Sequence, residues 1–425
     1  MKIHKLRDLL LIKNGKDHSV LSDGKIPVYG SGGIMRYANK SIYNDESILL
    51  PRKGTLSNIQ YVNKPFWSVD TIYYTIVNKD LADPFFLFNY LKSLDLSNLN
   101  TGTGVPSMTF ESYYNLEIKL PSISIQKQIS AVLSSLDSKI ELNNRINAEL
   151  EQMAKTIYDY WFVQFDFPIS AEYAASIGQP QLEGKPYNSS GGKMVWSGEL
   201  KREVPEGWEV KKLEDLGTIV GGSTPSRDID ENFSNNGMPW ITPKDLSLNA
   251  GNKFIKKGEI DVSDLGLKSA SLTVMPKGTV LMSSRAPVGY LAISRNEVTT
   301  NQGFKSFIPN KGVCSEFIFY SIKNLMPVIE NNASGSTFKE ISTSVLKNIK
   351  DILPASEVIN RFEVQVKTTF RRQELIETEN QKLTELRDWL LPMLMNGQVM
   401  VVDMVDEGVM GMAAEAVEEY IVRGE

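Results

Sequence analysis

The chain has 425 residues, of which 41% are hydrophobic, so it is long enough for two or three domains that each bury a core. Cys314 is its only cysteine, which excludes a disulfide framework and a thiolate metal cluster. No run approaches the roughly 18 apolar residues of a membrane span, and the apolar run at 9–12 is too short for a signal peptide, so we expect a cytoplasmic protein.

The net charge of −5 is unevenly distributed along the chain. Residues 400–425 carry seven acidic side chains and one basic side chain, so the rest of the chain is nearly neutral. Neither globular half is strongly basic, unlike a general phosphate binder. Any contact with nucleic acid would therefore depend on local loops.

The first half of the chain predicts a strand-rich domain followed by a long helix. Runs of β-branched and aromatic residues, such as 47–50 and 71–77, predict strands within a globular domain over 1–120, with a short helix over 84–94. The long helix is expected over 121–166, with Ser122 or Ser124 as its N-cap and Pro168 just beyond its end.

The second half predicts the same order of parts after a linker. Residues 167–204 are rich in glycine, proline and serine, which is typical of a linker. A second globular domain is expected over 205–353, with a helix over 315–325. A second long helix over 354–399 has Gly397 as a C-cap signal, and an acidic tail over 400–425 follows.

Both long helices carry one heptad register. Seam positions recur at alternating spacings of four and three residues, which is the pattern of a coiled coil. In the first helix they are Ile129, Leu133, Leu136, Ile140, Asn143, Asn147, Leu150, Ala154, Ile157 and Trp161. Adding 233 to each number gives Phe362, Val366, Thr369, Gln373, Ile376, Asn380, Leu383, Arg387, Leu390 and Leu394. The chain is therefore a tandem repeat of a globular domain followed by a long helix.

The globular halves repeat more loosely than the helices. Residues 5–9 match 212–216, Gly15 matches Gly222, 26–29 match 238–241, and 48–54 resemble 280–289. The offset drifts from 207 to 233 across these matches, so the loops differ in length while the helices do not. This is expected if loops carry divergent recognition and helices carry a fixed geometry.

The order, spacing and duplication of these parts resemble the specificity subunit of Type I restriction–modification systems over nearly the whole chain. The resemblance lies in the segments from 102–104 to Pro121 and from 335–337 to Pro354, each leading into a long helix, and in the linker segments 184–194 and 204–210. The residues after Val399 lie beyond the shared pattern.

The resemblance implies an α+β fold with two strand-rich target-recognition domains, joined by two long helices packed as an antiparallel coiled coil. Such packing of equivalent helices would relate the domains by a pseudo-twofold axis. The resemblance also implies a non-catalytic subunit that reads one half of a split double-stranded DNA site with each domain. Modification (methyltransferase) and restriction (nuclease or translocase) subunits would dock on it.

Several seam positions are polar rather than apolar, among them Asn143, Asn147, Gln373 and Asn380. Polar seam residues lower the stability of a coiled coil but set its register. Alternatively, these side chains line a solvated or partner-facing part of the bundle.

Candidate DNA contacts lie in polar loops that contain glycine. Arginine can read guanine, asparagine and glutamine can read adenine, and small residues let the backbone approach phosphate, although ordinary turns have the same composition. The first-domain candidates are Ser31, Gly32, Arg52, Lys53, Thr55, Thr101, Thr103 and Ser107. Those in the second domain are Ser223, Thr224, Arg227, Ser284, Arg285, Asn301, Gln302, Ser336, Thr337 and Lys339.

Catalytic chemistry finds little support in the sequence. With one cysteine and two histidines, His4 and His18, the chain lacks ligands for zinc and partners for cysteine–histidine catalysis, and we expect no metal, cofactor or catalytic residue. The sequence leaves two alternative functions, each from another class of protein. One is a nuclease or adenine methyltransferase with its own recognition domains, and the other is a coiled-coil scaffold that binds no DNA.

If the helices set the distance between half-sites, insertions in one helix should change the spacer of the DNA target. Seven residues inserted after Glu141 keep the heptad phase and lengthen the helix by about 10 Å, whereas four residues add about 6 Å and break the phase. We expect the seven-residue insertion to be tolerated better and to shift the spacer without changing either half-site. Methylome sequencing of cells that carry each insertion tests this, and full activity with an unchanged spacer would contradict it.

Overall fold

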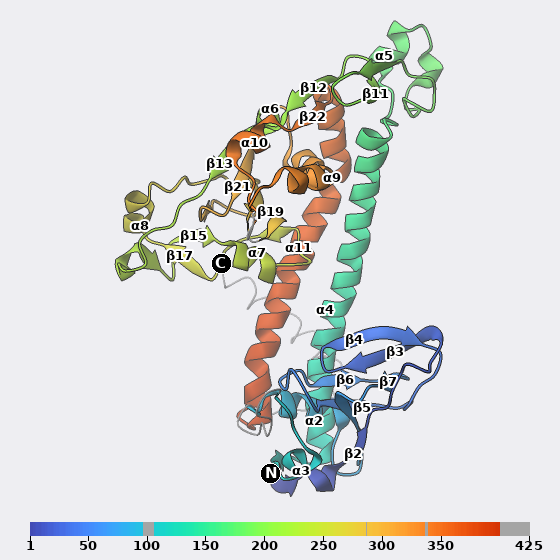
Figure 1. Ribbon diagram of the computed structural model, residues 1–425, viewed down its shortest axis with the longest axis vertical. Helices are drawn as coiled ribbons and strands as arrows, with labels where there is room; N and C mark the ends of the chain where they lie inside the picture. Colours follow the sequence, from blue (N-terminus) through green and yellow to red (C-terminus); the bar gives the residue numbers. More distant parts are fainter. Residues whose placement is uncertain (97–105, 286, 336–338, 400–425) are drawn as a thin grey trace, which may run out of the picture. The chain divides into compact units, whose positions relative to one another are not determined.

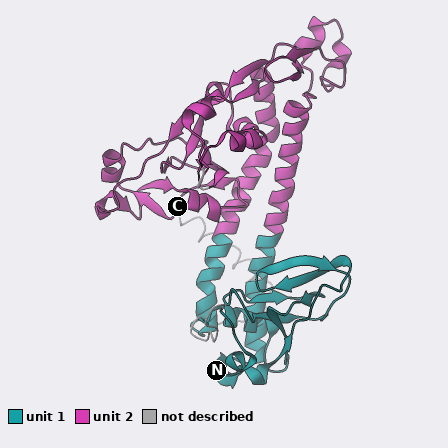
Figure 2. Cartoon of the chain, viewed as in Figure 1, with its two compact units in different colours: residues 1–141, 382–425 teal, residues 142–381 magenta. Residues whose placement is uncertain are grey.

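The computed structural model describes residues 1–96, 106–285, 287–335 and 339–399 (Figure 1). The chain divides into two compact units, Met1–Glu141 with Lys382–Glu425 and Leu142–Gln381 (Figure 2). Each unit contains one globular domain together with a part of both long helices, α4 (Ile123–Tyr158) and α11 (Ser356–Met395).

The globular part of the first unit is built from small sheets and short helices. One sheet has the strand order β2-β8-β5-β6, another has the order β4-β3-β7, and β1 pairs with β9. The elements are β1 (Lys2–Lys5), α1 (Leu6–Leu9), β2 (Leu10–Asn14), β3 (Asp23–Gly30), β4 (Gly33–Ala38), β5 (Ser47–Pro51), β6 (Gln60–Val62), β7 (Trp67–Ser68), β8 (Ile72–Val77), α2 (Pro84–Lys92), α3 (Phe110–Tyr114) and β9 (Glu117–Leu120).

The core of the first unit joins this globular part to the long helices. Helix α2 begins at Pro84 because the Asp83 carboxylate accepts a hydrogen bond from the Phe86 amide at 2.9 Å, which caps the helix. The buried side of α2 then packs in one cluster with Ile129 of α4 and Leu394 of α11. The start of α4 therefore lies against the end of α11, as antiparallel packing requires.

The second unit contains the larger sheets. Their strand orders are β13-β21-β18-β19-β16 and β14-β17-β15-β20, and β12 pairs with β22. The elements after the linker are β12 (Glu209–Lys212), α6 (Leu213–Leu216), β13 (Gly217–Gly221), η4 (Asp230–Asn232), β14 (Phe233–Ser234), β15 (Met238–Ile241), α7 (Pro243–Leu248), β16 (Phe254–Ile255), β17 (Ile260–Val262), α8 (Asp264–Ser269), β18 (Val280–Ser284), β19 (Val288–Ser294), β20 (Thr299–Thr300), β21 (Lys305–Pro309), α9 (Ser315–Asn332), α10 (Thr343–Asn348) and β22 (Lys350–Leu353).

The two globular parts share one topology. The pairs β2-β8 and β8-β5 of the first unit correspond to β13-β21 and β21-β18 of the second, and the parallel pair β3-β7 corresponds to β15-β20. Gly15 and Gly222 also occupy equivalent places. A Cβ atom on Gly15 would lie 1.9 Å from the Val69 carbonyl oxygen, and one on Gly222 would lie 2.0 Å from that of Thr300. Both positions therefore require glycine, because the backbone passes too close for a side chain.

The segment predicted as a linker has its own short elements in the structure. A π-helical turn, η2 (Asp159–Val163), ends the first long helix, and α5 (Ala171–Ser176), η3 (Pro180–Leu182), β10 (Met194–Ser197) and β11 (Arg202–Pro205) follow. Phe167 stacks on Tyr187 and on Trp208, with ring centroids 4.7 and 4.9 Å apart. The segment is therefore anchored by aromatic packing, which its glycine and proline content does not reveal.

The predicted seam lies between the two long helices in each unit. None of its twenty positions is exposed. In the second unit the Trp161 ring lies 5.9 Å from that of Phe362, so the end of α4 packs against the start of α11. Helix α11 ends two residues before Gly397, whose φ of 70° is the left-handed conformation of a C-cap. The predicted α+β fold with antiparallel helices is thus confirmed.

The polar seam residues are hydrogen-bonded across the helix pair. Asn143 is 2% exposed and donates to Glu379 at 2.7 Å and to Asn380 at 2.9 Å. Gln373 is 1% exposed and donates to the Asn147 carbonyl oxygen at 3.3 Å. These contacts favour a role in setting the register over a solvated surface, since a shifted register would leave buried amides without partners.

We expect Phe362→Ala to lower the free energy of unfolding by about 3–5 kcal/mol, because it leaves a cavity in the aromatic cluster of the second unit. Phe362 is fully buried and contacts Tyr158, Trp161 and Phe162. Val364→Ala, two residues along α11 at a side chain that is 75% exposed, is the matched control and should have little effect. Urea denaturation of the full chain measures both, and equal losses would contradict the packing described.

Candidate nucleic-acid interface

Strand pairing in the second unit gathers three separate loops at one end of the five-stranded sheet. Gly221, the last residue of β13, pairs with Lys305, the first residue of β21. Strand β18 runs antiparallel to β21, so its last residue, Ser284, also lies at this end. The loops after β13, after β18 and before β21 are therefore neighbours, although the loop after β13 lies about 60 to 80 residues before the other two in the sequence.

Hydrogen bonds connect these three loops. The Ser223 amide donates to the Thr300 carbonyl oxygen at 3.0 Å, and the Ser284 amide donates to that of Gly303 at 2.7 Å. The Thr224 hydroxyl donates to the Gln302 side-chain oxygen. Five of the sequence candidates, Ser223, Thr224, Ser284, Asn301 and Gln302, thus belong to one connected set of loops.

A small cluster of charged side chains lies beside these loops. Arg285 is half-buried, and its guanidinium lies 3.9 Å from the Glu340 carboxylate. Burial lowers the pKa of the nearby Lys305 ammonium, and the neighbouring Glu340 charge only partly offsets this effect. A further anion close to Lys305 would favour its charged form, because it would compensate for the lost hydration.

The first unit gathers its candidate loops around Thr71. The Ser31 amide at the turn between β3 and β4 donates to the Thr71 hydroxyl at 3.4 Å, and the Arg52 amide after β5 donates to the Thr71 carbonyl oxygen at 2.9 Å. The Gly54 amide donates to the Pro106 carbonyl oxygen at 2.9 Å, and Lys53 forms a β-bridge with Ser107. Ser31, Arg52, Lys53 and Ser107 therefore lie in adjoining loops, with Gly32 and Thr55 exposed next to them.

The remaining sequence candidates differ in exposure and in position relative to these loops. Ser284 is fully buried, so its hydroxyl does not face solvent, and of that pair Arg285 alone reaches the surface. Arg227 is exposed in the segment that follows the Ser223 loop, and Lys339 is exposed beside Glu340. Thr101, Thr103, Ser336 and Thr337, like the acidic tail 400–425, lie outside the described residues.

The structure adds residues that the sequence did not indicate. In the first unit, the Asn58 amide donates to the Ser31 carbonyl oxygen at 2.7 Å, and the Gln60 amide donates to that of Gly30 at 3.2 Å. Lys305 and Glu340 are the additions in the second unit. Only the pairing of segments distant in the sequence brings each of these residues to the candidate interface.

Across the described part of the chain, no group of histidine, cysteine, aspartate and glutamate side chains could hold a metal ion. None of the helices in that part is long and apolar enough to cross a membrane. Burial raises the pKa of the Cys314 thiol, so it is poorly suited to be a nucleophile.

The family model of the Type I restriction modification DNA specificity domain matches residues 1–152 and 205–387. The HindI specificity subunit of Haemophilus influenzae is 30% identical over 367 residues, which are 76% of this chain and 79% of that protein. The MjaIX specificity subunit of Methanocaldococcus jannaschii is 38% identical over 198 residues, which are 44% of this chain and only 45% of that protein.

Among solved structures, the Type I restriction–modification S subunit from M. genitalium has the same fold, with a TM-score of 0.63 at 15% identity. The match covers 92% of this chain and 95% of that one. The family model covers most of the chain, in two segments that coincide with its two repeats. The chain therefore belongs to the family of Type I restriction–modification DNA specificity subunits.

Proposed function

We propose that this chain selects a bipartite site on double-stranded DNA and reads one half with each globular domain. The target-recognition domains would be 1–120 and 205–353, with spacer helices over 121–166 and 354–399 and the connecting segment 167–204. Modification (methyltransferase) and restriction subunits would dock on this non-catalytic subunit in the cytoplasm, where its DNA target lies. The observation that carries the proposal is the repeated topology, which gathers polar loops at one end of a sheet in each unit.

The loops of the second unit have the chemistry to read bases. Arg285 can form paired hydrogen bonds with guanine, and Asn301 or Gln302 can do so with adenine. The ion pair of Arg285 with Glu340 is long and partly exposed, so it restrains the guanidinium weakly. Arg285 can therefore exchange Glu340 for a base without a large loss of free energy.

The loops of the first unit place two basic residues, Arg52 and Lys53, next to each other in different surroundings. The Arg52 guanidinium donates to the Asp70 carbonyl oxygen at 3.3 Å and lies 6.0 Å from the Tyr73 ring centroid. Lys53 is exposed beside it. We assign Arg52 to base reading, because its position is restrained, and Lys53 to a phosphate contact, because an exposed ammonium can follow the DNA backbone.

Exchange of residues 1–120 for the corresponding domain of a relative with another specificity should change one half of the recognised sequence and leave the other half intact. The reason is that each unit gathers its own set of loops. The full chain is co-expressed with its modification subunits, and methylome sequencing identifies the modified motif. Exchange of 205–353 is the matched control and should change the opposite half. A change in both halves after either exchange would refute the assignment of one domain to each half-site.

Arg285→Ala should reduce discrimination at one base pair by about 1–3 kcal/mol if the guanidinium reads a base. Binding of the assembled complex to DNA with each base substituted in turn measures this effect. Lys244→Ala, at an exposed lysine of the same domain that pairs with Glu259 and is not among the candidate contacts, is the control. A uniform loss of affinity over all sequences would instead identify Arg285 as a phosphate contact.

A further inference from the structure

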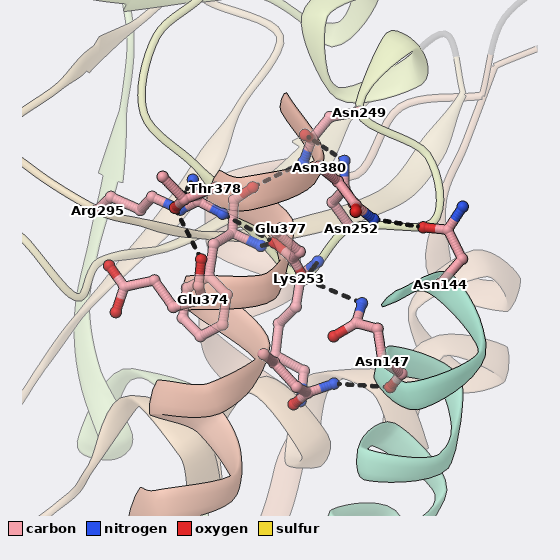
Figure 3. A network of polar contacts seen from close by, with 12 residues as sticks. Asn144, Asn147, Asn249, Asn252, Lys253, Arg295, Glu374, Glu377, Thr378 and Asn380 are labelled. Carbon is pink, nitrogen blue, oxygen red and sulfur yellow. Dashed lines mark hydrogen bonds and ion pairs between the residues drawn. The ribbon is translucent and has the colours of Figure 1, made fainter. Parts of the chain in front are cut away.

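A single buried carboxylate on α11 holds the edge of the five-stranded sheet in the second unit. Glu377 is 4% exposed and accepts hydrogen bonds from the backbone amides of Lys253 and Phe254, at 2.8 and 3.0 Å (Figure 3). These amides lie at the start of β16, the edge strand. Amide groups of an edge strand need partners, and here a side chain of the long helix provides them.

The Glu377 carboxylate also interacts with Arg295 of the domain and with Asn147 of α4. The Arg295 guanidinium, just after β19, lies 3.1 Å from Glu377 and also donates to the Thr378 hydroxyl at 2.8 Å. The Asn147 amide of α4 donates to Glu377 at 3.3 Å. Glu377 thus joins the sheet to both long helices, since it accepts from the domain and from α4 while it belongs to α11.

Lys253 makes the reciprocal connection from the domain. Its ammonium lies 2.6 Å from the Glu151 carboxylate of α4, and it donates to the Gln373 side-chain oxygen of α11 at 2.8 Å and to the Tyr320 hydroxyl at 3.0 Å. All three N–H donors of the lysine are therefore used. We call Lys253, Glu377, Glu151, Gln373 and Arg295 the clamp.

Two members of the clamp, Lys253 and Glu151, form a charged pair at neutral pH. Burial lowers the pKa of Lys253 to about 8, against the opposing charge of Glu151. Burial alone would raise the pKa of Glu151, but the ammonium groups of Lys253 and Lys323 outweigh it and bring the pKa to about 2. The contact between Lys253 and Glu151 is therefore charge-assisted and short, whereas burial raises the pKa of the Glu377 carboxyl.

Apart from the clamp, the domain contacts the helices through apolar packing, and a cavity lies beside the clamp. Helix α9 packs on α4 through aromatic contacts, such as Phe317 with Tyr158 at 6.0 Å between ring centroids. Apolar contacts of this kind are not strongly directional. Beside the clamp lies a cavity of about 730 Å³ whose lining includes Gln152 of α4, Asn252 before β16, and Met326 of α9. Without the clamp, the domain could tilt about its apolar contacts into this space.

We propose that the clamp is a positioning device that fixes the orientation of the second target-recognition domain on the helices, and thereby restricts the complex to one spacer length. The proposal rests on the bipartite DNA recognition inferred above. One additional base pair between half-sites shifts the second half by about 3.4 Å and rotates it by roughly 35°. A rigidly held reader rejects such a site, whereas a reader that can tilt accepts it in part.

Lys253→Met tests the proposal, because it removes the charge and the three hydrogen bonds but keeps a side chain of similar length. The full chain is expressed with its modification subunits, and methylome sequencing compares sites whose spacer is one base pair longer or shorter with sites of the preferred spacer. We expect the ratio of modification at altered spacers to that at the preferred spacer to rise about tenfold, which corresponds to about 1.4 kcal/mol. The half-site sequences should not change.

Lys244→Met is the matched control, because Lys244 forms an exposed ion pair with Glu259 in the same domain at 2.5 Å. It should leave the spacer ratio unchanged. The double variant Lys253→Met with Glu151→Gln removes both charges of the ion pair, so that no carboxylate paired with Lys323 alone remains, and it should widen the spacer preference like the single variant.

Folded clamp variants with an unchanged spacer ratio would overturn the proposal. So would a proportional loss of modification at every spacer, since that is the effect of lower stability alone. A methylome without any split motif for the unaltered chain would refute the bipartite function itself, and is thus distinguishable from failure of the clamp.

Discussion

The side-by-side packing of α4 and α11 is the constraint on which both units depend. Long helices with charged outer surfaces have little stability alone, and most of their stability comes from the face that they bury. Here that face is also part of each domain core, because Ile129 and Leu394 pack with the first globular part, and Trp161 and Phe362 with the second. Folding of the helices and folding of the domains are therefore coupled in each unit.

Strand pairing is the second constraint, and it assembles the candidate interface. Antiparallel pairing of β21 with β13 and β18 brings three sequence-distant loops to one sheet end, and pairing of β8 with β2 and β5 does the equivalent around Thr71. The strands leave the loops free to vary in length and sequence. A fixed platform with variable loops suits a subunit that recognises a DNA target, because the loops can change while the strands stay in place.

The clamp is specific to one repeat, although the helices are equivalent. With the offset of 233 residues, the position of Glu377 corresponds to Asn144 in the first helix. The first unit has a different polar connection, in which the Asp83 amide donates to Gln126 of α4 at 2.9 Å. The repeat therefore preserves the apolar seam but not the polar contacts that orient each domain. Apolar packing tolerates substitution by side chains of similar volume, whereas a buried hydrogen-bond network requires all of its members.

The sequence by itself determined the tandem plan, the two long helices with their seam, and the loops that carry polar and basic residues. These features are periodic or local, so they remain visible without contacts between distant residues. Only the tertiary structure decided that Ser284 is buried while Arg285 is at the surface, that Thr71, Lys305 and Glu340 lie beside the candidate loops, and that the linker segment is anchored by stacked aromatic rings. It also decided the clamp, because Lys253 and Glu377 lie 124 residues apart and neither stands in a recognisable motif. Which polar residues become partners depends on strand register and burial, and no local pattern encodes either of them.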